Sequence, residues 1–517
     1  MGLPPPIGLA SPQPRRRLRA CRTATAFAFT GAAIVLAAGA WPIGAQTDTL
    51  VPAAAYAARR ERLARVTMPG VVLVPGRHLV GQHELPRQDA DFWYLTGVES
   101  PYAVLAMAPD LRPGAARGAV RAMLFLPDTF EFAGAQFPMI DSGFRRASWN
   151  VPRRRLAPGA GASRLTGIAE TYPLSELAAR IRELAGATAT VYLPLGADSL
   201  YAPPGVARPL PVEQQVARAL GDLLPGRERR DVTPLVRRLR LVKDAHEIAA
   251  LREAAAISAQ SFVTLMRRVA PGMNDLEAAG ILEAEWKRLG AARASFAPII
   301  SSGPNTMTFF SLTGERYDAV GRVMREGDLV FNDYGAAEVR RYASDICRTF
   351  PVSGRFSAEQ RTYYDVVLEA QEAAIAAIKP GAMMLDVIRA AAEVFRAHGL
   401  ERYEDIATMG PDKVWGIMPS PTHYLARNGG IARYTRFGGG VRDLGHHIGL
   451  DATDSRDWSV PLEPGMVVTI EPKIYIPERG IAIMIEDMVL VTPRGRENLS
   501  AAAPRKAAEI ERLMRRR

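Results

Sequence analysis

The chain has 517 residues, of which 48% are hydrophobic and 23% are charged, and its formal net charge is +11. This apolar content supports about two to three folded domains and excludes an intrinsically disordered protein. The basic residues are scattered and do not alternate with aromatic residues in a stripe, so the composition also argues against nucleic-acid binding.

The first 46 residues have the composition of an export signal. Five arginines precede an alanine-rich apolar run at residues 24–40, which is followed by Pro42 and small residues up to Ala45. This order is typical of a cleaved signal peptide. We therefore expect an exported protein, periplasmic or secreted, whose net charge falls to +6 when these arginines are removed. A retained membrane anchor is the alternative, which the short run and Pro42 disfavour.

Residues 47–228 are predicted to form an α/β domain, because helical periodicity alternates with short apolar strands. Helices are expected at residues 53–66, 174–184 and 212–224, and strands at residues 70–74, 103–108 and 122–126. No cluster of potential metal ligands occurs in this domain, which suggests a role in substrate shaping or oligomerisation. The Pro-, Gly- and Arg-rich residues 225–230 are interpreted as a linker to a second domain, residues 229–517.

The second domain contains an internal repeat. Two helices, the first preceded by a capping pattern at Asp244, end at Gly290, and two further helices end at Gly399, at an offset of 109 residues. Each helix pair is followed by two short apolar strands that carry acidic residues. These acids are Asp333 and Asp345 in the first copy, and Glu471 and Glu486 in the second. The repeat predicts that both copies contribute carboxylates to one centre.

Four buried carboxylates require cations, and their combined charge suits two divalent metal ions. Strand alternation places Glu486 opposite to Asp487, so Glu486 is the predicted ligand. A nitrogen ligand comes from His446 or His447, and because adjacent strand residues face opposite ways, one binds metal while the other packs. One imidazole among carboxylates favours manganese or a similar ion over structural zinc. Two such ions indicate hydrolysis of an amide or related bond.

The chain resembles the aminopeptidase P and prolidase family of M24B-like metallopeptidases, which have the pita-bread fold. The resemblance rests on motifs at residues 87–97, 329–335, 344–351, 445–451, 469–472 and 485–487. It implies an α+β protein, with the amino-terminal α/β domain followed by a pseudo-twofold pita-bread (creatinase/aminopeptidase) catalytic domain. It also implies that two divalent ions, manganese favoured and zinc or cobalt as alternatives, are bound by Asp333, Asp345, His446, Glu471 and Glu486. In the same way, Asp345 and Glu486 are expected to bridge the ions, and Glu471 to handle the proton of the attacking water.

The chain departs from the family at four positions. Phe310, Arg442 and Thr453 stand where the family has histidines, and Met484 stands where it has an arginine. The family histidines hold the substrate carbonyl and move protons, so their loss is expected to affect the rate. His423 and Arg442 are the candidate catalytic residues that could take over these roles, and Glu471 is the third candidate catalytic residue.

The leading hypothesis is therefore an exported dinuclear-metal aminopeptidase that hydrolyses the bond between the first residue of a peptide and a following proline. Two alternatives remain open because of the missing histidines: a peptidase or dipeptidase with non-proline selectivity, or a metal-binding pita-bread protein with weak catalysis. Metal-free, creatinase-like chemistry is disfavoured, because all five ligands are present. The expected partner is a peptide, with no nucleic acid, no stable membrane anchor after signal removal, and homo-oligomerisation left open.

Overall fold

The computed structural model describes residues 51–78, 87–116, 118–127, 156–196, 209–307, 321–399, 444–455, 457–476 and 479–515. All of them belong to one compact unit. The expected export signal lies outside the described residues. Within these ranges, no helix combines the length and the apolar composition that a membrane span requires.

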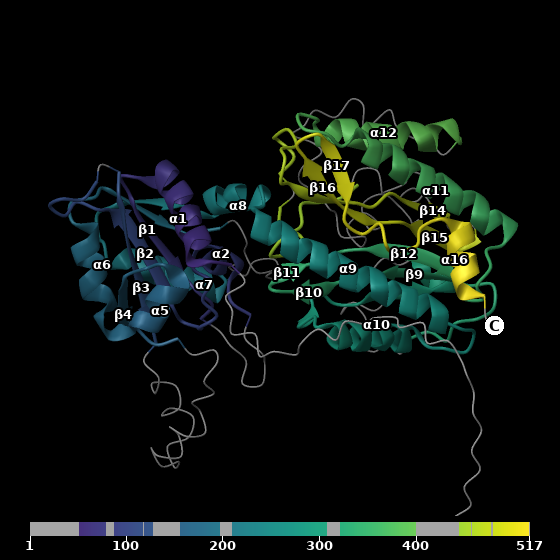
Figure 1. Ribbon diagram of the computed structural model, residues 1–517, viewed down its shortest axis with the longest axis horizontal. Coiled ribbons are helices and arrows are strands. Elements are labelled where there is room, and N and C mark those ends of the chain that lie inside the picture. Colours follow the sequence, from purple (N-terminus) through teal and green to yellow (C-terminus); the bar gives the residue numbers. More distant parts are fainter. Residues whose placement is uncertain are drawn as a thin grey trace, which may run out of the picture. The chain divides into compact units, whose positions relative to one another are not determined.

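A six-stranded sheet forms the core of the amino-terminal part (Figure 1), in the order β4-β3-β2-β1-β5-β6. Its strands are β1 (Val71–Pro75), β2 (Val104–Pro109), β3 (Val120–Leu126), β4 (Glu170–Pro173), β5 (Thr190–Leu193) and β6 (Glu228–Asp231). The pairs β1–β2 and β2–β3 are antiparallel, whereas β4, β5 and β6 each run parallel to the neighbour they join. The predicted linker was therefore wrong in part, because residues 228–231 form an edge strand.

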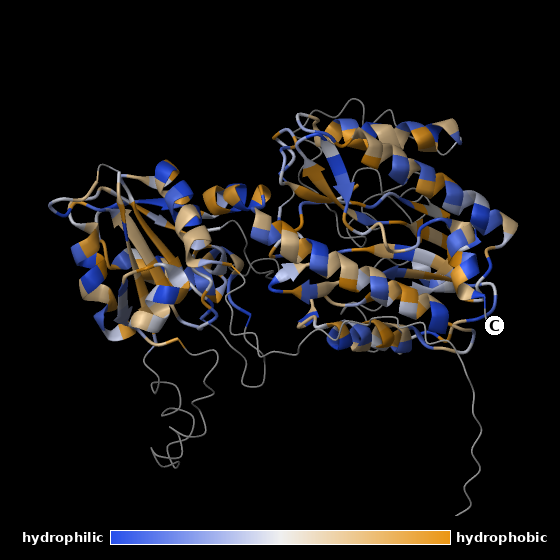
Figure 2. Cartoon of the chain, in the orientation of Figure 1, coloured by the Kyte–Doolittle hydropathy of each residue, from blue (hydrophilic) through white to orange (hydrophobic). Residues whose placement is uncertain are grey.

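Helices cover both faces of this sheet. They are α1 (Ala53–Thr67), α2 (Ala90–Thr96), α5 (Ala160–Thr166), the 3-10 helix η1 (Leu174–Glu176), α6 (Leu177–Ala185) and α7 (Val212–Asp222). Val72 and Val74 of β1 belong to the same apolar cluster as side chains of α1 and α2, and Val71 and Leu73 to a cluster with side chains of α6 and α7. The central strands β1 and β2 are accordingly mostly hydrophobic, while the helices show mixed faces (Figure 2) and the edge strand β6 is charged. This arrangement is the α/β layer structure that the sequence predicts.

The rest of the chain contains two helix pairs that match the predicted repeat. After α8 (Thr233–Leu241), α9 (Ala245–Arg268) packs on α10 (Asp275–Leu289), and α11 (Ala358–Ala377) packs on α12 (Met384–Ala397). A capping box at Asp244 and Glu247 begins α9, and another at Ser357 and Gln360 begins α11. The described chain ends with α16 (Ala507–Met514).

Each helix pair is accompanied by an antiparallel strand pair that encloses a smaller hairpin. In the first copy β9 (Leu329–Asp333) pairs with β12 (Cys347–Pro351) and encloses β10 (Ala337–Val339) and β11 (Tyr342–Ala343). In the second, β13 (Val467–Ile470) pairs with β16 (Asp487–Thr492) and encloses β14 (Lys473–Ile476) and β15 (Ile481–Met484). The strands β7 (Arg293–Ala294), β8 (Ile299–Ser302) and β17 (Gly495–Asn498) complete these sheets, and the 3-10 helix η2 (Gly303–Met307) follows β8.

The two copies join where the acidic residues lie. Arg348 of β12 forms a bridge with Ile485, and the backbone N–H of Glu486 donates to the Cys347 carbonyl at 3.0 Å. The strand ends of both copies therefore meet at a single centre, as the repeat predicts.

Candidate metal centre

The four predicted acids occupy equivalent places at the ends of paired strands. Asp333 is the last residue of β9 and Asp345 lies just before β12, while Glu471 follows β13 and Glu486 precedes β16. Register fixes these places, because Cys347 pairs with Asp333 in the first copy. All four acids are no more than 6% exposed. The fold thus removes four carboxylates from water within one region.

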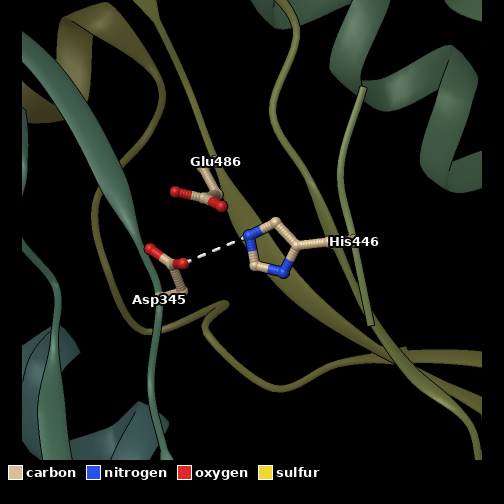
Figure 3. A group of neighbouring side chains, drawn as sticks. All are labelled: Asp345, His446 and Glu486. Atoms are coloured by element: carbon tan, nitrogen blue, oxygen red, sulfur yellow. Dashed lines mark ion pairs between the residues drawn. The ribbon is translucent and has the colours of Figure 1, made fainter. Parts of the chain in front are cut away.

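His446 supplies the nitrogen of the centre. Its Nε2 lies 3.4 Å from Oδ2 of Asp345 and 3.9 Å from Oε1 of Glu471. Ligand atoms of Asp345, His446 and Glu486 all lie within 4.8 Å of one another. Figure 3 shows the two carboxylates pointing toward the same edge of the imidazole ring, with the Asp345 contact drawn as a dashed line. Three side chains from distant parts of the sequence therefore converge on one point.

Three of the four carboxylates each have one oxygen that no group in the described part of the chain satisfies. Burial, followed by repulsion from Asp345 and Glu471, raises the pKa of Asp333 and of Glu486 well above the usual range. Oδ1 of Asp333, Oδ1 of Asp345 and Oε2 of Glu486 are buried and accept no hydrogen bond from the described part of the chain. Oxygens in this state fit divalent cations, which bind carboxylate oxygens and remove the cost of burying them.

Arg348 fixes the direction in which Glu486 points. This fully buried side chain pairs with Asp487 at 2.6 Å and donates to the Glu486 carbonyl at 2.5 Å. Asn498 and Ser500 also donate to the Asp487 carboxylate. Asp487 therefore faces away from the centre, and the predicted opposition of the two adjacent acids is confirmed.

A single amide from α11 holds both strands of the second copy. Nε2 of Gln371 donates to the carbonyl of Ile470 at 3.3 Å and to that of Ile485 at 3.0 Å. These are the residues immediately before Glu471 and Glu486. Because the amide spans both backbones, it keeps the two acids at a fixed separation.

The structure also decides between the two adjacent histidines. The His447 ring packs on Trp458 with 4.4 Å between centroids, and its Nε2 contacts the Asp457 carbonyl at 3.3 Å. Burial lowers the pKa of His447 well below the usual range, so this ring is neutral. A Cβ at Gly445 would collide with the Thr469 carbonyl oxygen, so this glycine lets the histidine segment approach β13. Only His446 faces the acids.

Lys473, which the sequence analysis did not single out, also belongs to the centre. The side chain is buried, and its Nζ donates to Oε2 of Glu471 at 3.1 Å. Glu471 and Lys473 are two residues apart in an extended segment, so their side chains share a face. This spacing is the signal that sequence inspection offered, but it does not reveal what that face contacts.

Ion pairs, one of them fully buried, hold the loop that follows the histidines. Nη1 of Arg240 contacts Asp91 at 2.5 Å, and its Nη2 contacts Asp451 at 2.7 Å and also Asp454. Nη1 of Arg87 contacts Asp451 at 3.0 Å. The amino-terminal part thus reaches the loop through charged side chains.

Two of the four positions at which the chain departs from the family lie within the described residues. Phe310, Arg442 and the candidate catalytic His423 lie outside the described residues. Thr453 is exposed on the loop between the two aspartates. Met484 is fully buried in a small apolar cluster with Phe331, Cys347 and Ala482. Neither of the two described positions carries a charge.

Comparison with known proteins places the chain in a family. Residues 56–192 match the aminopeptidase P N-terminal domain, and residues 249–493 match metallopeptidase family M24. Xaa-Pro aminopeptidase of Escherichia coli K12 is 32% identical over 473 residues, which cover 88% of this chain and 96% of that protein. The chain belongs to the aminopeptidase P family.

Other relatives agree with this membership. Xaa-Pro aminopeptidase 1 of Streptomyces coelicolor is 30% identical, over 90% of this chain and 88% of its own length. The solved structure of E. coli aminopeptidase P in its low-pH form has a TM-score of 0.69 and 28% identity, and the match covers 90% of this chain and 98% of that one. The expected fold, an α/β domain followed by a pita-bread domain, is confirmed. As a member of a metallopeptidase family, the protein is a hydrolase that uses divalent metal ions.

Proposed function

We propose that this aminopeptidase P family member is an exported Xaa-Pro aminopeptidase that removes the first residue of a peptide when proline follows, using two divalent ions, with manganese favoured. The observation that carries the proposal is the set of three buried oxygens, on Asp333, Asp345 and Glu486, that accept no hydrogen bond from the described part of the chain, two of these acids being grouped with His446. The names of the relatives supply the substrate class. Export rests on the composition of the first 46 residues.

The chain's own residues have separable roles in this reaction. Asp333, Asp345, His446, Glu471 and Glu486 would hold the ions. When bound, the ions supply Lewis-acid chemistry that polarises the scissile carbonyl and acidifies the attacking water. The Glu471 carboxylate, with Oε1 toward the imidazole, accepts the proton released by that water. The buried surroundings exclude bulk water, which strengthens these electrostatic interactions.

The test measures release of the first residue from an Xaa-Pro-Xaa tripeptide by the purified protein with manganese. The Asp345→Asn variant should lose at least about a thousandfold in kcat/KM, because it removes a charged carboxylate that would hold the ions. Asp365→Asn, which changes an exposed acid of α11, is the matched control and should keep full activity. A metal-loaded protein that releases nothing from any Xaa-Pro peptide would overturn the proposed function.

A second candidate function is peptidase activity without proline selectivity. The observation in its favour is Met484, which lies in an apolar cluster at a position where the family resemblance implies an arginine. A matched set of Xaa-Ala-Xaa and Xaa-Pro-Xaa tripeptides separates the two candidates. Faster release from the alanine peptides would support this second function.

A further inference from the structure

One arginine of the amino-terminal part contacts both of the segments that lead to metal ligands. Nε of Arg87 lies 2.7 Å from Oε2 of Glu338, in the β10–β11 hairpin that separates the two aspartates of the centre. Its Nη1 lies 3.0 Å from Oδ1 of Asp451, and its Nη2 donates to the Leu450 carbonyl. Both of these acceptors belong to residues 447–455, the histidine loop. A single guanidinium therefore joins the hairpin to the histidine loop.

The hairpin transmits the position of Glu338 to Asp345. Glu338 pairs with Ala343 across the hairpin, and the Ser344 N–H donates to the Ala337 carbonyl at 2.9 Å. Asp345 is the next residue along the chain. Because these bonds hold the two strands together, a contact that fixes Glu338 also fixes the backbone that carries the Asp345 carboxylate.

The histidine loop is closed by its own hydrogen bonds. The His447 N–H donates to the Ser455 carbonyl at 2.9 Å, and the Gly449 N–H donates to the Asp451 carbonyl at 3.1 Å. These bonds connect Asp451 to the backbone beside His446. A contact that holds Asp451 therefore restricts the direction from which the His446 imidazole approaches the acids.

The hairpin and the histidine loop also touch directly. The Ala343 N–H donates to the Gly449 carbonyl at 2.8 Å. One hydrogen bond allows two segments to pivot about it, whereas a second attachment at another point fixes their relative orientation. Arg87 provides such a second attachment through its contacts with Glu338 and Asp451.

The role of Arg87 is separable from charge compensation. Without Arg87, Glu338 still contacts Arg293 at 3.2 Å, and Asp451 still contacts Arg240 at 2.7 Å. Each acid thus keeps a cation when Arg87 is replaced, so the variant avoids an uncompensated buried charge. What the replacement removes is the fork that spans both segments.

We propose that Arg87 is a positioning residue of the metal centre. By contacting the hairpin and the histidine loop at once, it sets the placement of the Asp345 carboxylate relative to the His446 imidazole, which lie 3.4 Å apart. It thereby raises the affinity for divalent ions. This inference rests on metal binding by the proposed centre and not on its peptide specificity.

The test measures manganese affinity of the full-length protein by chelator competition. Arg87→Met should weaken the affinity by about ten- to a hundredfold, the loss typical of groups that orient metal ligands from outside the centre. Arg293→Met is the matched control, because Arg293 contacts the same Glu338 carboxylate but not the histidine loop. Its affinity should equal that of wild type. Arg87→Lys keeps the charge but not the planar fork, so it should recover little of the lost affinity.

Three outcomes would overturn the inference: unchanged affinity in Arg87→Met, equal losses in Arg87→Met and Arg293→Met, or wild-type affinity in Arg87→Lys. Circular dichroism of the metal-free variants checks that they are folded. Should Arg87→Met fail to fold, Arg87→Lys decides. Peptide turnover is measured separately. A wild-type protein that cleaves no Xaa-Pro peptide, while the variants show the expected affinities, would contradict the proposed function and leave this inference supported.

Discussion

Replacing Arg348 with methionine should destabilise the protein more than removing any exposed arginine. Arg348 and its partner Asp487 are both 0% exposed, and Arg348 also donates to the carbonyls of Cys347, Ala503 and Pro504. Breaking a buried pair costs about 3–5 kcal/mol, and each unsatisfied buried carbonyl adds about 1 kcal/mol or more. We expect the free energy of unfolding to fall by at least about 4 kcal/mol.

Urea unfolding of the metal-free protein, followed by circular dichroism, measures this change. Arg252→Met is the matched control, because Arg252 forms an exposed pair with Glu497 and its loss should cost less than about 1 kcal/mol. The double variant Arg348→Met with Asp487→Leu should recover part of the loss, since it removes the uncompensated charge. Equal destabilisation by Arg348→Met and Arg252→Met would refute the argument.

Three further predictions concern metal binding. Gln371→Leu should weaken manganese affinity by about tenfold, because the amide no longer holds the two strands, and chelator competition measures the change. His446→Ala should weaken affinity by at least about tenfold while His447→Phe leaves it unchanged; similar losses in both would contradict the assignment. Burial, followed by repulsion from Asp345 and Glu471, raises the pKa of Asp333 and of Glu486 above their ordinary 3.8 and 4.5. The metal-free folded state therefore holds more protons than the unfolded chain above about pH 4. Metal-free stability should therefore fall as pH rises from about 5 to 7, and manganese binding should release protons, which calorimetry in two buffers detects.

Features governed by local sequence were predictable. Capping residues and periodicity located the long helices, and strand alternation separated Glu486 from Asp487 correctly. The repeat predicted that acids from both copies would meet, which they do.

Features that depend on distant neighbours were not predictable. The choice between His446 and His447 required the position of Trp458, and the role of Lys473 required knowing that its face meets Glu471. The Pro-, Gly- and Arg-rich composition of residues 225–230 predicts a linker, yet residues 228–231 form β6. Charge is common on edge strands, where it prevents unwanted pairing.

The ion pairs of Arg87 and Asp91 limit which parts of this chain can be exchanged with the corresponding parts of other proteins. Both residues lie in the amino-terminal part, yet they neutralise charges around the loop that follows the metal-centre histidine. A chimaera that exchanges residues 47–228 would leave Asp451 without Arg87 and Arg240 without Asp91, so the two parts are not interchangeable modules. Any functional graft must carry this pair of residues with it.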